Sequence, residues 1–451
     1  MLFRSTTVVI LAAGLGTRMR SKQAKVLHRA GGQALVEHVV QAAGSVAAPE
    51  NTVVVTGHQA EAVEDVLRPL GVRFARQVEQ RGTGHAVMCA REMLEQADPK
   101  HDGLLMVLYG DTPLLAAATL KKLRDAQAKS KAAATLITTT LDDPTGYGRL
   151  LTEGDALAGI VEHADASQAQ RAIGLCNGGL MAFAGHSALA ILSRIGCENR
   201  KNEFYLTDAV GIARGMNLRA VAIEVTEDEV SGINSKAQLA EAEAVMQQRL
   251  RQTALEAGVT LVAPDTVHLA ADTKLGRDVV VEPYVVFGPG VTVEDGATIR
   301  SFSHLQGAHV GKDAIVGPFA RLRPGAKLGQ GAHIGNFVEI KEATIEAGAK
   351  ANHLAYIGDA RVGEGANVGA GTITCNYDGF VKSLTDIGAG AFVGSNSALV
   401  APVKIGDGAI VAAGSVVTRD VPAEALAVAR GRQEVKPGWA RAFRKQRGKK
   451  K

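Results

Sequence analysis

The feature that most constrains the fold is a six-residue periodicity in the C-terminal part of the chain. Between residues 275 and 340 an aliphatic residue or Phe recurs at every sixth position, with one step of five, and the six-residue spacing returns between residues 387 and 417. The recurring positions are Leu275, Val281, Phe287, Val293, Ile299, Leu305, Val310, Val316, Leu322, Leu328, Ile334 and Ile340, and later Ile387, Val393, Leu399, Ile405, Val411 and Val417. Three such hexads make one triangular coil whose interior is filled by the aliphatic side chains. The repeat therefore predicts a β-helix, and the abundance of Gly in this region suits its tight corners.

The one long break in this periodicity lies between Val368 and Ile387 and contains the segment TITCNYDG. A loop that leaves a solenoid is held by rigid coils while its own backbone is free to vary. We therefore expect this loop to be a functional element.

The N-terminal half has a different pattern, in which apolar strand-like runs alternate with amphipathic stretches up to about residue 230. The runs include TTVVILAA, NTVVVTGH, LLMVLYGD and AATLITTT. This alternation predicts a mostly parallel sheet covered by helices, in which ligands bind at the carboxyl ends of the strands. Residues 236–257 contain no Gly or Pro and are rich in helix formers, which predicts a long helix. We expect an α/β Rossmann-like domain over residues 1–232, a linker with the long helix over 233–257 and the β-helix over 258–451.

The composition argues against several classes of protein. Hydrophobic residues make up 46% and charged residues 21%, as in ordinary globular proteins, and no segment approaches the apolar length of about 20 residues that a membrane span needs. The net charge of +4 is small and much of the basic excess lies in residues 444–451, so we expect neither nucleic acid nor a membrane as a partner. The four cysteines form no CxxC pair, which favours reduced thiols and a cytoplasmic location.

A first candidate site follows the first predicted strand, in the segment VVILAAGLGTRMRSKQAKVL. Gly14 and Gly16 allow close approach of a ligand to the backbone, exposed N–H groups can bind phosphates, and Arg18 and Lys25 can offset their charge. The segment contains no Walker motif, and Met19 stands where GxGxxG needs its last Gly. From these residues alone, a phosphate-binding loop and a simple tight turn are equally plausible.

A second feature is the segment YGD that ends the run LLMVLYGDTPLL, which places Asp111 at the carboxyl end of a buried strand. A carboxylate there suits Mg²⁺, a hard cation that binds oxygen ligands and keeps phosphate oxygens and waters in its shell. An Asp that only stabilises the next turn, before Pro113, explains the same residues equally well.

Together these segments resemble the sugar-nucleotide pyrophosphorylases, whose N-terminal signature LxxGxGTRM followed by a Lys is matched here by LAAGLGTRM and Lys25. QRGTGHA, YGD, PTGYGR and IVEH extend the resemblance. The C-terminal half adds GNFVEIK, GAGTITCNYDG and VAAGSVVTRD. In this order, over nearly the whole chain, the motifs resemble the bacterial bifunctional N-acetylglucosamine-1-phosphate uridyltransferases and glucosamine-1-phosphate acetyltransferases, which implies that the β-helix is left-handed.

The resemblance implies two substrate sets in the N-terminal domain: UTP, and N-acetylglucosamine 1-phosphate as the attacking sugar. Asp111 and Asn234 would hold Mg²⁺, and Arg18 and Lys25 would offset charge during catalysis. The residues expected around UTP and the sugar nucleotide are Leu11, Ala12, Ala13, Gly14, Lys25, Gln77, Gly82, Thr83, Tyr109, Gly110, Asp111, Gly148, Glu162, Asn177 and Asn234. Of these, Gly148, Glu162 and Asn177 would contact the sugar.

A second candidate site lies in the repeat, where KANHLAYIG contains His353. Acetyl transfer from a thioester to an amine needs a neutral amine, so a His that can accept a proton suits this chemistry; without context, a His on the coil surface is the commoner case. The resemblance makes His353 the base, Arg323, Lys341, Tyr356 and Asn367 the ligands of glucosamine 1-phosphate, and Ala370, Asn376, Tyr377, Ser395, Ala413 and Arg430 the residues near acetyl-CoA. It also implies a homotrimer, with each acetyl-transfer site between neighbouring coils. We expect direct transfer, because no pattern in the sequence marks Cys375 as an activated nucleophile.

Two positions depart from the family's pattern: Gly178 follows Asn177 where Thr or Ser is usual, and Ser235 follows Asn234 where a second Asn is common. These departures concern the affinity or specificity for the sugar more than the reaction. Two alternatives also remain: a glucose-1-phosphate nucleotidyltransferase with a regulatory β-helix, and a non-enzymatic trimeric scaffold.

Overall fold

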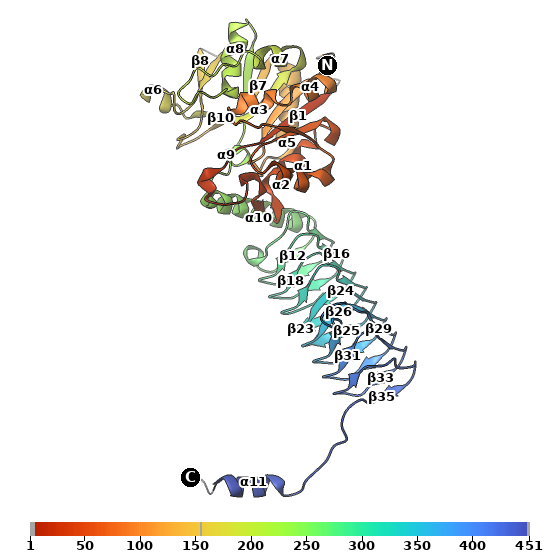
Figure 1. Ribbon diagram of the computed structural model, residues 1–451. Helices are drawn as coiled ribbons and strands as arrows, with labels where there is room; N and C mark the ends of the chain where they lie inside the picture. Colours follow the sequence, from red (N-terminus) through yellow and green to blue (C-terminus); the bar gives the residue numbers. More distant parts are fainter. Residues whose placement is uncertain (1–4, 99, 101, 154–155, 449–451) are drawn as a thin grey trace. The chain divides into compact units, whose positions relative to one another are not determined.

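The structure is a computed structural model that describes residues 5–98, 100, 102–153 and 156–448. It divides into two compact units, Met1–Arg249 and Leu250–Lys451, which are described separately (Figure 1). The border between them falls inside α10 (Lys236–Glu256), which is the long helix expected over residues 236–257. The domain boundaries drawn from the sequence stay a prediction.

The first unit is built on a nine-stranded sheet with the order β11-β7-β10-β6-β1-β4-β5, to which the hairpin β8-β9 attaches at β10. Strand β10 runs antiparallel to its neighbours β6 and β7, whereas the other neighbours on this path are parallel. The mostly parallel sheet expected from the alternating pattern is therefore confirmed. The strands are β1 (Thr6–Ala12), β4 (Thr52–Thr56), β5 (Arg73–Arg76), β6 (Leu104–Tyr109), β7 (Ala134–Thr140), β8 (Arg149–Glu153), β9 (Ala156–Val161), β10 (Leu175–Ala184) and β11 (Ala220–Glu224).

Helices cover both faces of this sheet, because its central strands are apolar on both sides. In β1, Val8 and Ile10 face one core and Val9 and Leu11 face the other. The first core is completed by α1 (Leu35–Ala43), α2 (Ala60–Leu67) and α5 (Ala117–Ser130). The second is completed by α3 (Thr83–Met88), α4 (Arg91–Ala97), α7 (Gly185–Leu192) and α8 (Ala209–Gly215).

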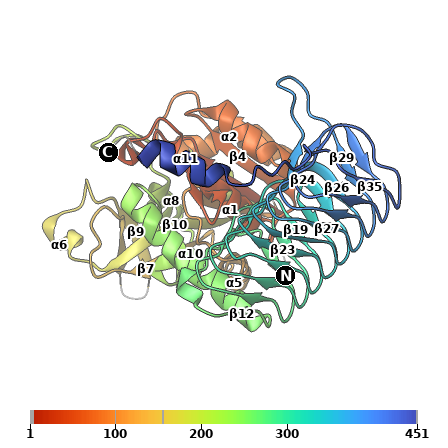
Figure 2. The same ribbon diagram turned by 90° about the horizontal axis from the view of Figure 1, so that it is seen from below.

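The second unit is a parallel β-helix that runs from β12 (Thr260–Leu261) to β35 (Leu426–Ala427), as expected from the hexads (Figure 1). Successive coils stack in register, and Figure 2 shows their edges one behind another. Along one face, for example, Lys274 pairs with Thr292, and Thr292 pairs with His309. Every hexad position named above is buried except Leu275, which is half-buried at the first coil. The aliphatic residues thus form one continuous core.

The strands of the β-helix that carry candidate residues are short. They are β21 (Arg321–Leu322), β23 (His333–Asn336), β24 (Glu339–Ile345), β25 (Lys350–His353), β26 (Tyr356–Val362), β27 (Asn367–Val368), β28 (Ile373–Cys375) and β29 (Thr385–Ile387).

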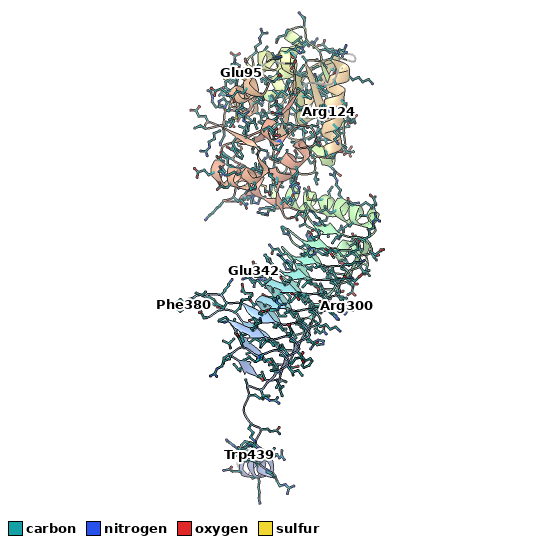
Figure 3. All side chains as sticks on the ribbon, turned by 90° about the vertical axis from the view of Figure 1, so that its right-hand side faces the viewer. Glu95, Arg124, Arg300, Glu342, Phe380 and Trp439 are labelled. Atoms are coloured by element: carbon teal, nitrogen blue, oxygen red, sulfur yellow. The ribbon has the colours of Figure 1, made fainter. Side chains whose placement is uncertain are left out.

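The expected loop leaves the coils between β28 and β29. Figure 3 shows Phe380 projecting away from the coils, and this side chain is 93% exposed. Beyond the coils, α11 (Trp439–Arg447) carries the basic residues of the tail with no buried side chain, while Lys449–Lys451 lie outside the described residues. Among the helices that the structure describes, none combines the length and apolar character that crossing a bilayer requires.

Candidate functional site

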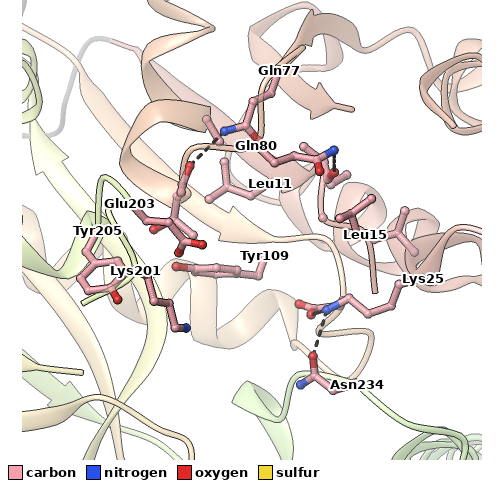
Figure 4. A pocket seen from close by; sticks show the side chains of 18 of the residues that line it. Leu11, Leu15, Lys25, Gln77, Gln80, Tyr109, Lys201, Glu203, Tyr205 and Asn234 are labelled. Atoms are coloured by element: carbon pink, nitrogen blue, oxygen red, sulfur yellow. Dashed lines mark hydrogen bonds and ion pairs between the residues drawn. The ribbon is translucent and has the colours of Figure 1, made fainter. Parts of the chain in front are cut away.

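A cavity of about 610 Å³ opens at the carboxyl ends of β1 and β6 in the first unit (Figure 4). Parallel sheets bind ligands at this edge, and the volume is in the range of a nucleotide-sized ligand. Twelve of the expected nucleotide-site residues line it: Leu11, Ala12, Ala13, Gly14, Lys25, Gln77, Gly82, Thr83, Tyr109, Asp111, Glu162 and Asn234. The structure therefore brings most of the predicted set together in one place.

The turn after β1 has a conformation that depends on Gly16. This residue has φ of +63°, and a Cβ added to it would lie 2.5 Å from Cβ of Lys25. Only Gly combines the left-handed backbone with that close contact. Gly16 thus lets the segment of Lys25 pack against the loop, which places the Lys25 side chain in the cavity (Figure 4).

A cation lies between two oxygen ligands on one side of the cavity. The Lys25 ammonium forms an ion pair with the Asp111 carboxylate and donates to Oδ1 of Asn234 at 3.1 Å. A backbone hydrogen bond of 2.9 Å from Ile233 N–H to the Asp111 carbonyl brings Asn234 to this position. Asp111 is therefore more than a turn residue, because its carboxylate faces the cavity and a positive charge.

Three residues expected at the sugar lie in one row across the hairpin and β10. Asn177 N–H donates to the Gly148 carbonyl at 2.9 Å, and a Cβ added to Gly148 would lie 3.6 Å from Oε1 of Glu162. Glu162 lines the cavity, and its Oε1 accepts a hydrogen bond of 2.8 Å from Thr207. The row continues the cavity wall, although Gly148 and Asn177 do not line the cavity themselves.

Two further expected residues lie outside the cavity lining. Gly110 is buried directly behind it, where its N–H donates to the Leu11 carbonyl at 2.9 Å. Arg18 is exposed on the short 3-10 helix η1 (Thr17–Met19) that follows the loop. A contact of Arg18 with a ligand therefore stays a prediction.

The structure also adds residues that the sequence did not single out. Lys201, Glu203 and Tyr205 line the cavity opposite the loop, from a segment without glycines or a recognisable motif (Figure 4). Burial raises the pKa of Tyr205 to about 12 and also raises that of Tyr109, so both hydroxyls stay protonated and can donate. Leu15, Val26, Gln80 and Ala86 complete the lining.

The two departures from the family pattern have local explanations. A Cβ on Gly178 would lie 3.0 Å from Val230 and 3.1 Å from Ile137, so a larger residue has little space there. Ser235 Oγ accepts from Gln238 N–H at 3.2 Å, at the start of α10. Its hydroxyl serves the helix end rather than the cavity.

In the β-helix, His353 is exposed at a corner of the coil, and its Nδ1 lies 2.7 Å from Oδ1 of Asn336, one coil earlier. An amide oxygen only accepts, so Nδ1 carries the proton and Nε2 is left with a free lone pair. Asn336 was missed in the sequence, yet it lies 17 residues before His353, which is the local length of one coil. This arrangement suits the expected base, and the catalytic role of His353 stays a prediction.

The residues expected near acetyl-CoA follow this corner along successive coils. Asn396 N–H donates to the Ala370 carbonyl at 2.7 Å, and Gly414 N–H donates to the Ser395 carbonyl at 2.8 Å. On the next coil Arg430 donates to the Ala413 carbonyl at 2.7 Å. Ala370, Ser395, Ala413 and Arg430 thus form one line that begins beside His353.

The expected sugar-phosphate ligands are only partly brought together. Arg323 forms an ion pair of 2.8 Å with Glu339, which lies next to Tyr356 in the register of β24 and β26. Lys341 lies beside Lys382 of the loop, and contact with that second cation lowers the pKa of Lys341.

Asn367, by contrast, belongs to β27 in a different sheet of the β-helix from β24 and β26. Within one chain it therefore faces away from the other three expected ligands.

The loop positions its own candidate residues. Asn376 is buried and its Nδ2 donates to the Asp359 carboxylate, which fixes the base of the loop. Tyr377 is 60% exposed, and its hydroxyl donates to the Gly379 carbonyl. The loop also places Lys382, a residue that the sequence did not single out, beside Lys341.

Comparison with known proteins finds a different family in each of the two units. Residues 8–175 match the family described as MobA-like NTP transferase domain. Residues 272–307, 307–342 and 385–419 match the family described as bacterial transferase hexapeptide (six repeats).

Full-length relatives carry both halves. The bifunctional protein GlmU of Azorhizobium caulinodans is 56% identical over 448 residues, which cover 99% of each chain. That of Rhodopseudomonas palustris (strain BisA53) is 58% identical over 450 residues, covering 99% of this chain and 98% of the relative. That of Nitrobacter hamburgensis is 58% identical over 445 residues, covering 98% and 97%. The chain therefore belongs to the family of the bifunctional protein GlmU, as the motifs of its two halves predicted.

Proposed function

We propose that the chain makes UDP-N-acetylglucosamine in two reactions. The β-helix transfers the acetyl group of acetyl-CoA to glucosamine 1-phosphate, and the first unit then transfers the uridylyl group of UTP to N-acetylglucosamine 1-phosphate with release of pyrophosphate. The product is a precursor of peptidoglycan and lipopolysaccharide. The observation that carries the proposal is the Lys25 ammonium held between Asp111 and Asn234 in a nucleotide-sized cavity.

Mg²⁺ fits this position. Asp111 and Asn234 offer a carboxylate and an amide oxygen, and both already converge on a positive charge. Among the described residues no three His, Cys, Asp or Glu side chains gather as a metal-binding group. Two protein oxygens suit Mg²⁺, which takes its other ligands from phosphates and water. When bound there, the ion offsets the negative charge of the phosphates.

The residues of the first unit have mainly positioning roles in uridylyl transfer. The backbone of Leu11 to Gly14 lies along the cavity where phosphates can approach, and Lys25 offsets charge beside it. The row of Gly148, Glu162 and Asn177 holds the sugar so that its 1-phosphate oxygen attacks the α-phosphorus of UTP in line, while pyrophosphate leaves. Arg18, on the exposed turn after the loop, would offset the charge of the leaving pyrophosphate.

In acetyl transfer His353 acts as the general base. Its Nδ1–H bond to Asn336 leaves Nε2 free to take a proton from the amine as nitrogen attacks the thioester carbonyl. The C–N bond forms, the C–S bond breaks, and the CoA sulfur leaves as thiol after it gains a proton. Arg323, Lys341 and Lys382 supply positive charge for the sugar phosphate. This is direct transfer, with no acyl intermediate on Cys375.

We also propose that the enzyme works as a homotrimer in the cytoplasm. His353 is exposed, and Asn367 lies on another sheet from Arg323 and Tyr356, so one chain does not enclose a substrate at this site. A coil of a neighbouring subunit would cover the site and would supply an Asn367 from its own second sheet. The four free cysteines suit a reducing compartment.

The two reactions are tested separately. UTP, N-acetylglucosamine 1-phosphate and Mg²⁺ should give pyrophosphate, and acetyl-CoA with glucosamine 1-phosphate should give free thiol. If folded protein lacks either product, the corresponding half of the proposal is wrong. No observation favours a regulatory β-helix or a non-enzymatic scaffold, and thiol release would contradict both.

A further inference from the structure

Arg149 is the largest fully buried side chain in the chain's described residues, with 1% of its surface exposed. It begins β8, directly after Gly148 of the expected sugar row. In the register of the hairpin it lies opposite Val161 and Cys176, which are the neighbours of Glu162 and Asn177. Because side chains alternate along strands, Arg149 lies on the opposite face of the hairpin, directly behind the sugar row.

The contacts of Arg149 are all with segments that lead into that row. Nη1 donates to the carbonyl of Tyr147. Nη2 donates to Nδ1 of His163 and to the carbonyl of Arg171, and both of these Nη2 hydrogen bonds measure 3.3 Å. Tyr147 precedes Gly148 and His163 follows Glu162. Arg171 ends α6 (Gln168–Arg171), the helix after the Glu162 turn.

No carboxylate within the described part of the chain forms an ion pair with Arg149, and its Nε has no hydrogen-bond partner. Hydrogen bonds with Thr145 and, to a smaller extent, the charge of Arg149 lower the pKa of the exposed Asp143, but this carboxylate forms no ion pair with the guanidinium. The cost of burying the charge of Arg149 therefore has to be offset mainly by the three acceptors. The donors of a guanidinium are spread over three nitrogens in a fixed planar fork, whereas those of a lysine ammonium all leave one nitrogen at the end of a flexible stem, so a lysine does not reproduce the same set of contacts. The segments that lead into the sugar row are therefore all held by the guanidinium of Arg149.

We propose that Arg149 is a positioning residue for the sugar substrate: it holds the 147–148 turn and the 162–171 segment so that Gly148, Glu162 and Asn177 keep their spacing. This inference rests on the proposed uridylyl transfer. It concerns one half of the cavity, because the UTP-side residues Gly14, Gln77 and Gly82 belong to segments that Arg149 does not contact.

The test is steady-state kinetics of Arg149→Met and Arg149→Lys in the full-length protein. For Arg149→Met, KM for N-acetylglucosamine 1-phosphate should rise by about tenfold or more, because a row that loses its spacing gives up at least about one hydrogen bond to the sugar. KM for UTP should change less than twofold, and Arg149→Lys should recover only part of the loss. Acetyl transfer by the same preparation serves as an internal control and should be unchanged.

Arg214→Met is the matched control. Arg214 is an exposed arginine that pairs with Glu153, at the other end of β8, and its loss should leave both KM values unchanged. If Arg149→Met does not fold, His163→Leu removes one acceptor and should raise the sugar KM by a smaller factor.

Two results would overturn the inference: an unchanged sugar KM in these variants, or equal increases in the KM for the sugar and for UTP, which would indicate a purely structural role. Absence of uridylyl transfer in the unaltered enzyme would instead refute the proposed function.

Discussion

Gly82→Ala should disturb the nucleotide site, because the added Cβ would clash with the backbone of Phe204. Gly82 has φ of +103°, and an added Cβ would lie 2.6 Å from the Phe204 carbonyl oxygen and 2.8 Å from its nitrogen. Phe204 has little freedom to withdraw, because its N–H donates to the Arg81 carbonyl and its carbonyl accepts from Gly84 N–H, both at 2.8 Å. The segment displaced is the one that carries Lys201 and Tyr205 into the cavity.

The expected loss of stability follows from two contributions. A non-Gly residue in this backbone region costs about 1–3 kcal/mol, and overpacking against fixed atoms costs about 1–3 kcal/mol more. The sum of about 2–6 kcal/mol is a large part of the stability of a typical domain.

Urea unfolding followed by circular dichroism should show the lower midpoint, and hydrogen exchange should show faster opening of residues 203–206. Uridylyl transfer should fall while acetyl transfer persists.

The control is Gly215→Ala, at the end of α8, where no atom lies within 4 Å of the added Cβ. This substitution should leave the midpoint unchanged or raise it slightly. A Gly82→Ala protein with the original midpoint and the original KM for UTP would refute the steric reasoning.

Three further predictions concern charge and packing. Lys25→Met should weaken UTP binding but strengthen binding of Mn²⁺ to the free protein in electron paramagnetic resonance titrations, because Asp111 loses its ion-pair partner; equal or weaker Mn²⁺ binding would contradict the metal site. Burial, with the charge of Glu162, raises the pKa of Asp208, so its ionised form destabilises the fold as the pH rises above the usual Asp pKa of about 4. Asp208→Asn should therefore raise the urea midpoint at pH 7 but not near pH 3, and a pH-independent gain would be inconsistent with this cause. Ile334→Ala in the β-helix core should cost about 2–5 kcal/mol in unfolding experiments, whereas the same change at the exposed Ile410 should cost little.

The β-helix was predictable from the sequence because its interior is one-dimensional. A hexad residue such as Ile334 pairs with the equivalent residue Val316 of the preceding coil, so a fixed spacing is enough to identify the core. Asn336 could have been found in the same way, one coil before His353. The exception is Leu275, which is only half-buried because it belongs to the first coil.

The cavity of the first unit was less predictable, because its walls come from distant segments. The resemblance named Lys25, Asp111 and Asn234, but the hydrogen bond between Ile233 and Asp111 that brings Asn234 to the other two is a tertiary contact that the sequence does not show. Lys201 and Lys382 lie on loops, whose conformation depends on packing rather than on a repeating pattern. Arg149 ends the segment PTGYGR, but nothing in that segment shows that its side chain is buried.

Complementation tests most directly whether one chain contains two independent sites that act in sequence on one sugar. With glucosamine 1-phosphate, acetyl-CoA, UTP and Mg²⁺, Asp111→Ala should accumulate N-acetylglucosamine 1-phosphate, and His353→Ala should form no acetylated sugar. Each variant alone should form no UDP-N-acetylglucosamine, and a mixture of the two should form it. Two results would contradict two independent sites: loss of acetyl transfer in Asp111→Ala, or conversion of glucosamine 1-phosphate into UDP-N-acetylglucosamine by His353→Ala alone.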